Sequence, residues 1–151
     1  MTEQQTKLPD LKVGVGALFV SIETNRVLLS IRSPHKTHSM CWSVFGGMKE
    51  YNESSKIALS RELTEEMGFE PKIEGTYPFN IYYSKDGHFK YVTFVCVVKE
   101  EFCPKLNSEN CGYCWINLGE WPKPLHQGVK FSFCNQKSIE RLKLILAQYK
   151  N

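Results

Sequence analysis

The 151-residue sequence has no long apolar run, no internal repeat and no low-complexity tract. No stretch approaches the roughly 20 apolar residues of a membrane span, and residues 1–10 lack the apolar centre of a secretory signal. These absences argue against a membrane protein and lead us to expect a cytoplasmic one. With 42% hydrophobic residues, the chain is long enough to fold as a single domain over residues 1–151, with residues 1–10 flexible.

Neither sign of charge is in large excess, since 19 Lys and Arg residues stand against 16 Asp and Glu residues. A net charge of +3 is small and dispersed, so it does not indicate a nucleic-acid surface, although it is compatible with a phosphorylated ligand.

The six cysteines do not indicate a disulfide framework, because the chain length and the missing signal favour reduced thiols. Cys111 and Cys114 form a CxxC pair, but a zinc ribbon needs a second pair at matching spacing, and Cys103 with His126 would make an irregular set. We expect buried or incidental thiols, with zinc binding and redox chemistry as the alternatives.

The segment from Gly47 to Phe69 carries the most information about function. Good helix formers occupy residues 53–67, capping oxygens precede them, and Gly68 stands where a helix often ends in a left-handed residue. We therefore expect a helix of about four turns. Leu59, Leu63 and Met67 recur at four-residue steps and predict a buried face.

A second face of this helix is acidic. Glu62, Glu65 and Glu66 stand at i, i+3 and i+4, so their carboxylates share one side. Clustered carboxylates raise one another's pKa unless a cation lies between them, and oxygen ligands suit Mg²⁺ or Mn²⁺. The spacing indicates a divalent-metal site at Glu62, Glu65 and Glu66.

Two glycines and an ion pair fit the same site. Gly46 and Gly47 could bring a backbone carbonyl close to a metal, and Glu53 lies near enough to pair with Arg61. The alternative is a solvated helix with ordinary ion pairs, since Arg61 and Glu65 are also spaced i, i+4.

The whole segment resembles the signature of the Nudix hydrolase family, G-x5-E-x7-R-E-U-x-E-E-x-G-U, where U is apolar. The sequence matches all of its specified positions, namely Gly47, Glu53, Arg61, Glu62, Leu63, Glu65, Glu66, Gly68 and Phe69. One departure precedes the motif, because many relatives carry proline where this chain has Phe45.

The resemblance implies a metal-dependent pyrophosphohydrolase. Its reaction would cut the pyrophosphate bond of a nucleoside diphosphate linked to X, such as ADP-ribose, FAD or a dinucleoside polyphosphate, giving a nucleoside monophosphate and phosphorylated X. The implied cofactor is Mg²⁺ or Mn²⁺, held by Glu62, Glu65 and Glu66 with help from Gly46 or Gly47. The implied partner is a small-molecule nucleotide, and a homodimer is compatible with it.

The general base is open, because family members differ in which glutamate takes the proton. Glu109, six residues ahead of Trp115, is the candidate outside the motif, and Glu62 and Glu65 compete with it. A solvated loop acid is the alternative for Glu109.

Candidate substrate contacts come from other segments. Arg32 follows an apolar strand pattern and could hold a phosphate with its fork of donors. Aromatic residues could stack on a base, or could equally belong to the core. The aromatic candidates are Trp42, Tyr82, Tyr83 and Trp115, and His35 and His38 lie in a loop that could cover the substrate.

Alternating apolar residues predict the remaining elements. Strands are expected at 12–22, 26–31, 42–45 and 112–117, a hairpin at 77–84 and 89–99, and a second helix at 138–149. Mixed strands with two helices on their faces predict an α/β sandwich, and the resemblance likewise implies a mixed sheet between helices, with the motif beside the active site.

Two other functions stay open at this point. The same catalyst could act on nucleoside triphosphates or on the capped 5′ end of RNA, although the small net charge gives little support to RNA binding. A nucleotide sensor without turnover is the second alternative, and the intact motif acids argue against it.

Overall fold

The computed structural model describes residues 11–150, so the expected flexibility of residues 1–10 lies outside the described part. That the whole chain forms one domain stays a prediction. In chain order the elements are β1 (Lys12–Ser21), β2 (Val27–Arg32), β3 (Trp42–Ser43), β4 (Phe45–Met48), α1 (Ser55–Met67), β5 (Gly75–Tyr83), β6 (Phe89–Val98), β7 (Asn110–Ile116), α2 (Gln127–Phe133) and α3 (Gln136–Ala147).

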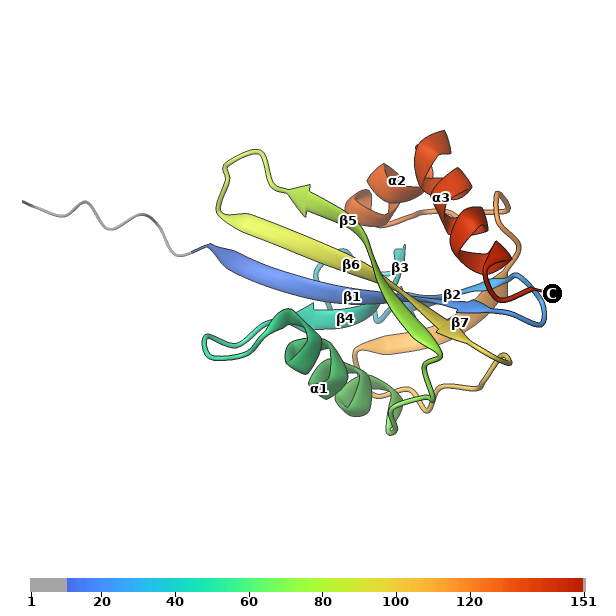
Figure 1. Cartoon of the computed structure of the whole chain (residues 1–151). Helices are drawn as coiled ribbons and strands as arrows, with labels where there is room; N and C mark the ends of the chain where they lie inside the picture. Colours follow the sequence, from blue (N-terminus) through green and yellow to red (C-terminus); the bar gives the residue numbers. More distant parts are fainter. Residues whose placement is uncertain (1–10, 151) are drawn as a thin grey trace, which may run out of the picture.

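A seven-stranded mixed sheet forms the middle layer, with α1 on one face and α2 and α3 on the other (Figure 1). β1 runs parallel to β6, whereas the β5–β6, β2–β7 and β2–β3 pairs are antiparallel. The predicted α/β sandwich with a mixed sheet is therefore confirmed.

On the side away from β6, β1 pairs with two different strands. Val20 pairs with Val27 of β2, while residues 14–17 pair with residues 45–48 of β4. β4 and β2 consequently meet β1 at different points along its length, and the polypeptide between them supplies residues to the functional site.

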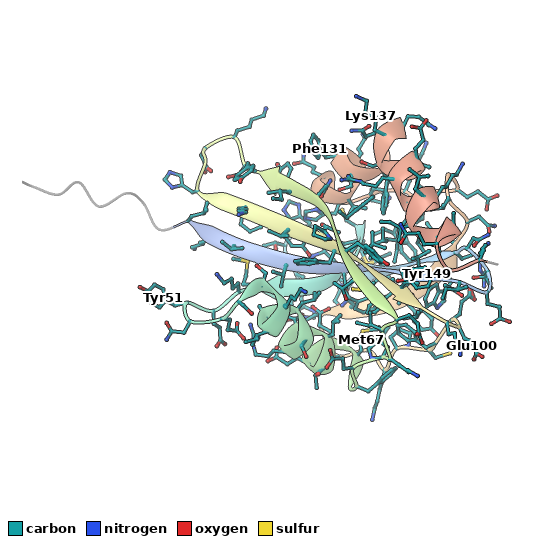
Figure 2. All side chains as sticks on the ribbon, in the orientation of Figure 1. Tyr51, Met67, Glu100, Phe131, Lys137 and Tyr149 are labelled. Atoms are coloured by element: carbon teal, nitrogen blue, oxygen red, sulfur yellow. The ribbon has the colours of Figure 1, made fainter. Side chains whose placement is uncertain are left out.

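Two hydrophobic cores lie on opposite faces of the sheet, and the alternation of β1 supplies both. Val15, Ala17 and Phe19 pack toward α1, whereas Leu18 and Val20 pack toward α2 and α3. Side chains fill the space between the sheet and the helices on both sides (Figure 2). Among the residues that the structure describes, every helix is too short or too polar to cross a bilayer.

The count of two helices was wrong, because α2 is a third. α2 has only seven residues, QGVKFSF, which is too short to show a helical repeat in the sequence. It directly precedes α3, which begins at Gln136 rather than at residue 138. The helix of the motif begins at Ser55, two residues later than expected, and ends at Met67 as expected.

A β-bulge in β5 changes which side chains share a face. Tyr77 pairs with Val95 and Pro78 with Phe94, but Asn80 pairs with Thr93, so Phe79 is an extra residue. Phe79 and Tyr77 therefore face the same side as Asn80 and Tyr82.

Candidate active site

The helix of the motif, α1, has defined ends that fix its rotation. The Ser54 side chain accepts a hydrogen bond from the Ile57 N–H, and Gly68 ends the helix with a φ of 75°. Ala58, Leu59, Leu63 and Met67 are buried against the sheet. Because this face is anchored, the acidic face has one orientation.

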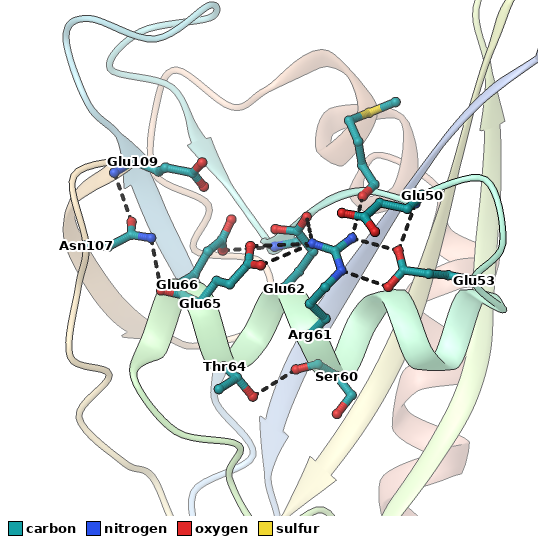
Figure 3. Close-up of polar contacts among 12 residues, drawn as sticks. Glu50, Glu53, Ser60, Arg61, Glu62, Thr64, Glu65, Glu66, Asn107 and Glu109 are labelled. Carbon is teal, nitrogen blue, oxygen red and sulfur yellow. Dashed lines mark hydrogen bonds and ion pairs between the residues drawn. The ribbon is translucent and has the colours of Figure 1, made fainter.

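The three predicted metal ligands on α1 differ in exposure. Glu66 is only 3% exposed and Glu62 is 9% exposed, whereas Glu65 lies at the surface. Figure 3 shows these carboxylates on one side of α1, together with Glu109 from the segment before β7. Buried carboxylates without neutralising partners are costly, so the arrangement indicates a functional cluster.

Arg61 braces the cluster from its outer side. Its Nε and Nη2 donate to the two Glu53 carboxylate oxygens at 2.7 and 2.8 Å, and Nη2 also donates to the Met48 carbonyl at 3.0 Å. Nη1 donates to Glu62 at 3.0 Å and reaches Glu65 at 3.3 Å. The guanidinium, followed by the Glu50 N–H, lowers the pKa of Glu53 to about 2. The fork thus ties the β4–α1 loop to the acidic face.

Glu66 lies at the deepest point of the cluster. Its carboxylate accepts the Gly46 N–H at 3.1 Å, which holds it against β4. Burial, together with the adjacent Glu109 carboxyl, raises the pKa of Glu66 to about 9. At neutral pH the Glu66 carboxyl therefore keeps its proton and is uncharged.

Glu62 lies against the backbone of Gly47. Burial raises its pKa despite the neighbouring Arg61. A Cβ atom at Gly47 would overlap the Glu62 carboxylate, and one at Gly46 would overlap the Val15 carbonyl oxygen. The glycine pair is therefore required by close packing of β4 against α1 and β1.

Glu109 reaches the cluster because neighbouring residues fix the loop before β7. Asn107 donates to the Glu65 carbonyl at 3.0 Å and accepts the Glu109 N–H at 2.9 Å. The Glu109 carbonyl accepts the Ser33 N–H at 2.9 Å, and its carboxylate contacts Lys36 Nζ at 3.5 Å. The loop is thereby tied both to α1 and to the end of β2.

The donor set at this cluster fits a hard divalent cation. Glu62, Glu66 and Glu109 supply carboxylate oxygens only, and the charged form of Glu66, which burial and Glu109 disfavour, would be stabilised by such a cation. Within residues 11–150, however, no three Asp, Glu, His or Cys side chains are arranged so that they could hold a metal ion together. Glu62 and Glu65 are instead paired with Arg61, so binding a metal requires them to rearrange.

A cleft of about 650 Å³ opens beside the cluster. Glu62, Glu109 and the two glycines line its acidic end. Two cationic side chains and two imidazoles also line it, namely Arg32 and Lys36, and His38 and His126. Its aromatic lining consists of Phe79, Tyr82, Phe89, Tyr91 and Phe133. The volume is in the range of sites for small molecules.

The comparison with protein families decides what this site is. The profile of the family described as NUDIX domain matches residues 10–133. The chain belongs to the Nudix hydrolase family. The predicted family and the predicted enzyme class, a pyrophosphohydrolase, are both confirmed by this match.

Solved structures share the Nudix fold at low sequence identity. A MutT Nudix hydrolase from Burkholderia pseudomallei is 23% identical, with a TM-score of 0.63, over 81% of this chain and 95% of its own. The Nudix domain of Shewanella oneidensis NrtR, complexed with ADP ribose, is 19% identical with a TM-score of 0.67, covering 97% and 99%.

A third similar structure is a bifunctional NMN adenylyltransferase/ADP ribose pyrophosphatase from Francisella tularensis. It is 19% identical with a TM-score of 0.58, over 91% of this chain and 41% of its own. Among curated protein sequences no match was found.

The Nudix cleft receives some of the predicted substrate contacts and not others. Arg32 and His38 line it, as does Tyr82. Tyr83 points to the opposite face, because the bulge at Phe79 shifts the alternation of β5 by one residue. Of these two candidates, Tyr82 is therefore the β5 aromatic of the cleft, and the prediction for Tyr83 was wrong.

Three other candidates do not line the cleft, namely Trp42, Trp115 and His35. Trp42 packs against the core beside α2 and α3, and its backbone N–H donates to the Pro124 carbonyl. Trp115 is buried against α1, and its indole N–H donates to the Phe102 carbonyl at 2.9 Å. His35 is exposed.

Sequence reasoning missed Tyr91 of β6. A Cβ atom at Gly14, Gly16 or Gly46 would collide with its ring or hydroxyl, so these glycines form a slot for the side chain. Burial raises the pKa of Tyr91, and Glu66 raises it further. The only signal in the sequence was glycine within a strand pattern, which often marks a close approach.

His126 was also missed as a cleft residue. Its Nδ1 accepts the Gly128 N–H at 3.2 Å, and its ring lies edge-on to His38 at 4.5 Å between centroids. Burial and the neighbouring His38 and Arg32 lower the pKa of His126 to about 4. The side chain is therefore neutral near pH 7, with its proton on Nε2.

The CxxC pair does not form a metal site with other described residues. Cys114 stands opposite Leu29, whereas Cys111 lies at a register shift between β2 and β7. Cys96 is buried and the other cysteines are at least partly accessible, and within residues 11–150 all six are free thiols.

Proposed function

We propose that this Nudix hydrolase cuts the pyrophosphate bond of a nucleoside diphosphate linked to X, with Mg²⁺ or Mn²⁺ as cofactor. The observation that carries the proposal is the cluster of the buried Glu62 and Glu66 carboxylates with the partly exposed Glu109, at one end of a cleft whose other walls are cationic and aromatic. Such a cleft suits a ligand with phosphates at one end and a flat ring at the other.

In this proposal Glu62 and Glu66 would hold the cation, and Glu65 would join them if it released its contact with Arg61. The cation supplies charge neutralisation at the phosphate oxygens and acidifies a bound water. Arg61 holds the β4–α1 loop and Glu62 in place through its bonds to Glu53 and the Met48 carbonyl. The Gly46 N–H orients the Glu66 carboxylate.

The proton of the attacking water needs an acceptor. We assign this role to Glu109, which faces Glu66 and lies in the cleft beside Lys36. Lys36 and Arg32 bind the phosphate oxygens. Arg32 is oriented for this because its Nε donates to the Thr37 carbonyl at 2.8 Å, which fixes the direction of the guanidinium.

Two of the similar structures have ADP-ribose in their descriptions, so ADP-ribose is the first compound to test. The panel adds FAD, diadenosine polyphosphates, nucleoside triphosphates and capped RNA. Products are identified by mass, and hydrolysis in ¹⁸O-water locates the attacked phosphorus. We expect release of a nucleoside monophosphate from at least one compound at about pH 7 to 9.5.

Matched variants separate catalysis from folding. Glu66→Gln should reduce turnover by a factor of about 10² or more, because a metal ligand is lost, while Glu140→Gln on the exposed face of α3 should not. Hydrolysis of no compound by the folded, metal-loaded protein would refute the proposed function. Near-normal turnover of both Glu62→Gln and Glu66→Gln would refute the ligand assignment.

A further inference from the structure

The part of the cleft between β5 and α2 carries a buried hydroxyl among aromatic rings. Ser132 of α2 lines the cleft and is 4% exposed, and it shares this lining with Phe79, Tyr82 and Phe133. Aromatic side chains of this kind pack against planar rings. Within such an apolar environment a single polar group has a large effect on which ring binds.

The hydrogen bonds of Ser132 leave it only one way to contact a ligand. Its hydroxyl donates to the Gly128 carbonyl at 3.1 Å and accepts from Asn80 Nδ2 at 2.5 Å. A serine hydroxyl has one proton and two lone pairs. With the proton and one lone pair in use, the remaining lone pair can only accept a hydrogen bond.

The fold holds this arrangement in place from both sides. Asn80 follows the bulge and stands opposite Thr93 in β6, so its side chain is directed to the α2 side of the sheet. Gly128 and Ser132 are one turn apart in α2, and Val129 and Phe133 anchor the same helix in the core. The acceptor character of Ser132 is therefore set by a backbone carbonyl of α2 on one wall and by the Asn80 side-chain amide of β5 on the other.

We infer that Ser132 Oγ accepts a hydrogen bond from an amino group of the substrate's base, which packs among the rings of this part of the cleft. The inference rests on the proposed function, because it takes the ligand to be a nucleotide. The exocyclic amine of adenine is such a donor. A base that presents only lone pairs at this point would oppose the Ser132 lone pair and bind less well.

Equilibrium binding of a product-like nucleotide tests this assignment without requiring turnover. AMP and purine riboside 5′-monophosphate differ only in the amine, so titration calorimetry of both with Mg²⁺ isolates one hydrogen bond. We expect AMP to bind about fivefold more tightly to the wild-type protein. Ser132→Ala should equalise the two affinities, whereas Ser138→Ala, another buried serine outside the cleft, should keep the difference.

Each outcome decides the assignment. Equal binding of the two nucleotides to the wild-type protein overturns it, and so does a preference for AMP that survives in Ser132→Ala. Binding of neither nucleotide overturns it as well. The wild-type comparison needs no variant, so the test stands even if Ser132→Ala is unstable. A preference for AMP without hydrolysis of any compound would instead reject the proposed function and keep the inference.

Discussion

Replacing Glu66 by glutamine should change how the stability of the metal-free protein depends on pH. Burial, followed by the Glu109 carboxyl, raises the pKa of Glu66 from 4.5 to about 9. In the unfolded chain the same carboxyl loses its proton near its ordinary pKa of about 4.3. Folding between these two pH values therefore takes up a proton at Glu66.

The sign and size of the effect follow from linkage. Because the folded pKa is raised, the stabilising contribution of Glu66 is complete below about pH 4 and is lost as the pH rises toward about 9. The loss is about 1.4 kcal/mol for each pH unit, or about 3 kcal/mol between pH 6.5 and 8.5. Glutamine does not titrate, so the Glu66→Gln protein lacks this slope.

The other groups with displaced pKa values, Glu62 among them, are retained in the Glu66→Gln variant, as Glu53 and His126 illustrate. Arg61 lowers the pKa of Glu53 to about 2, so the contribution of Glu53 is present above its unfolded pKa and constant here. His126, with a pKa lowered to about 4, costs stability only as the pH falls below about 6.5. Both groups are retained in the variant, and their effects cancel in the comparison.

Urea unfolding at 25 °C, in EDTA and at half-unit steps from about pH 6.5 to 8.5, measures the free energy of unfolding of both proteins. The difference between them should change by about 1.4 kcal/mol per pH unit, which corresponds to one proton. Parallel curves would refute the assignment of a buried, protonated Glu66. Added Mg²⁺ should stabilise the wild-type protein increasingly as the pH rises, because the metal competes with that proton.

Three further predictions concern activity on whichever substrate the panel identifies. Arg61→Lys should lower kcat by about tenfold to a hundredfold with little loss of helix content by circular dichroism, because lysine cannot form the two bonds to Glu53. Equal kcat values for the Arg61→Lys and wild-type proteins would contradict the role of the two Arg61–Glu53 bonds. Glu109→Gln should lower kcat by a factor of about 10² to 10⁴ with KM nearly unchanged, and a pH–rate profile that keeps its acidic limb would show that another glutamate is the base. Tyr82→Ala should raise KM severalfold, whereas Tyr83→Ala on the opposite face should not, and the reverse result would place Tyr83 in the cleft.

Much of α1 and its surroundings could be predicted because the signals are local in sequence. Ser54 and Gly68 define the helix ends, and the spacing of Glu62, Glu65 and Glu66 fixes one acidic face. The Arg61–Glu53 pair spans only eight residues, and its bonds have the expected form. Such short-range rules need no knowledge of the rest of the fold.

The other side of the cleft could not be predicted in the same way. α2 is too short to show a periodic pattern, and the bulge at Phe79, which the sequence does not mark, decides that Tyr82 rather than Tyr83 faces the cleft. The position of Glu109 beside Glu66 requires loop contacts to α1 and β2 that are more than 40 residues away in sequence. These features depend on tertiary packing.

Phe79, the extra residue in β5, lies between two parts of the strand that have different roles. Before it, Tyr77 joins the core, and after it, Tyr82 lines the cleft and Asn80 donates to Ser132 of the cleft wall. Deleting Phe79 would leave Pro78 opposite Phe94 and Asn80 opposite Thr93. It would therefore restore a continuous ladder, keep Asn80 and Tyr82 on the cleft side, and remove only the Phe79 ring from the cleft lining. A change in strand length by one residue at this point can thus alter the space available to a ligand, while Asn80, Tyr82 and the catalytic helix stay where they are.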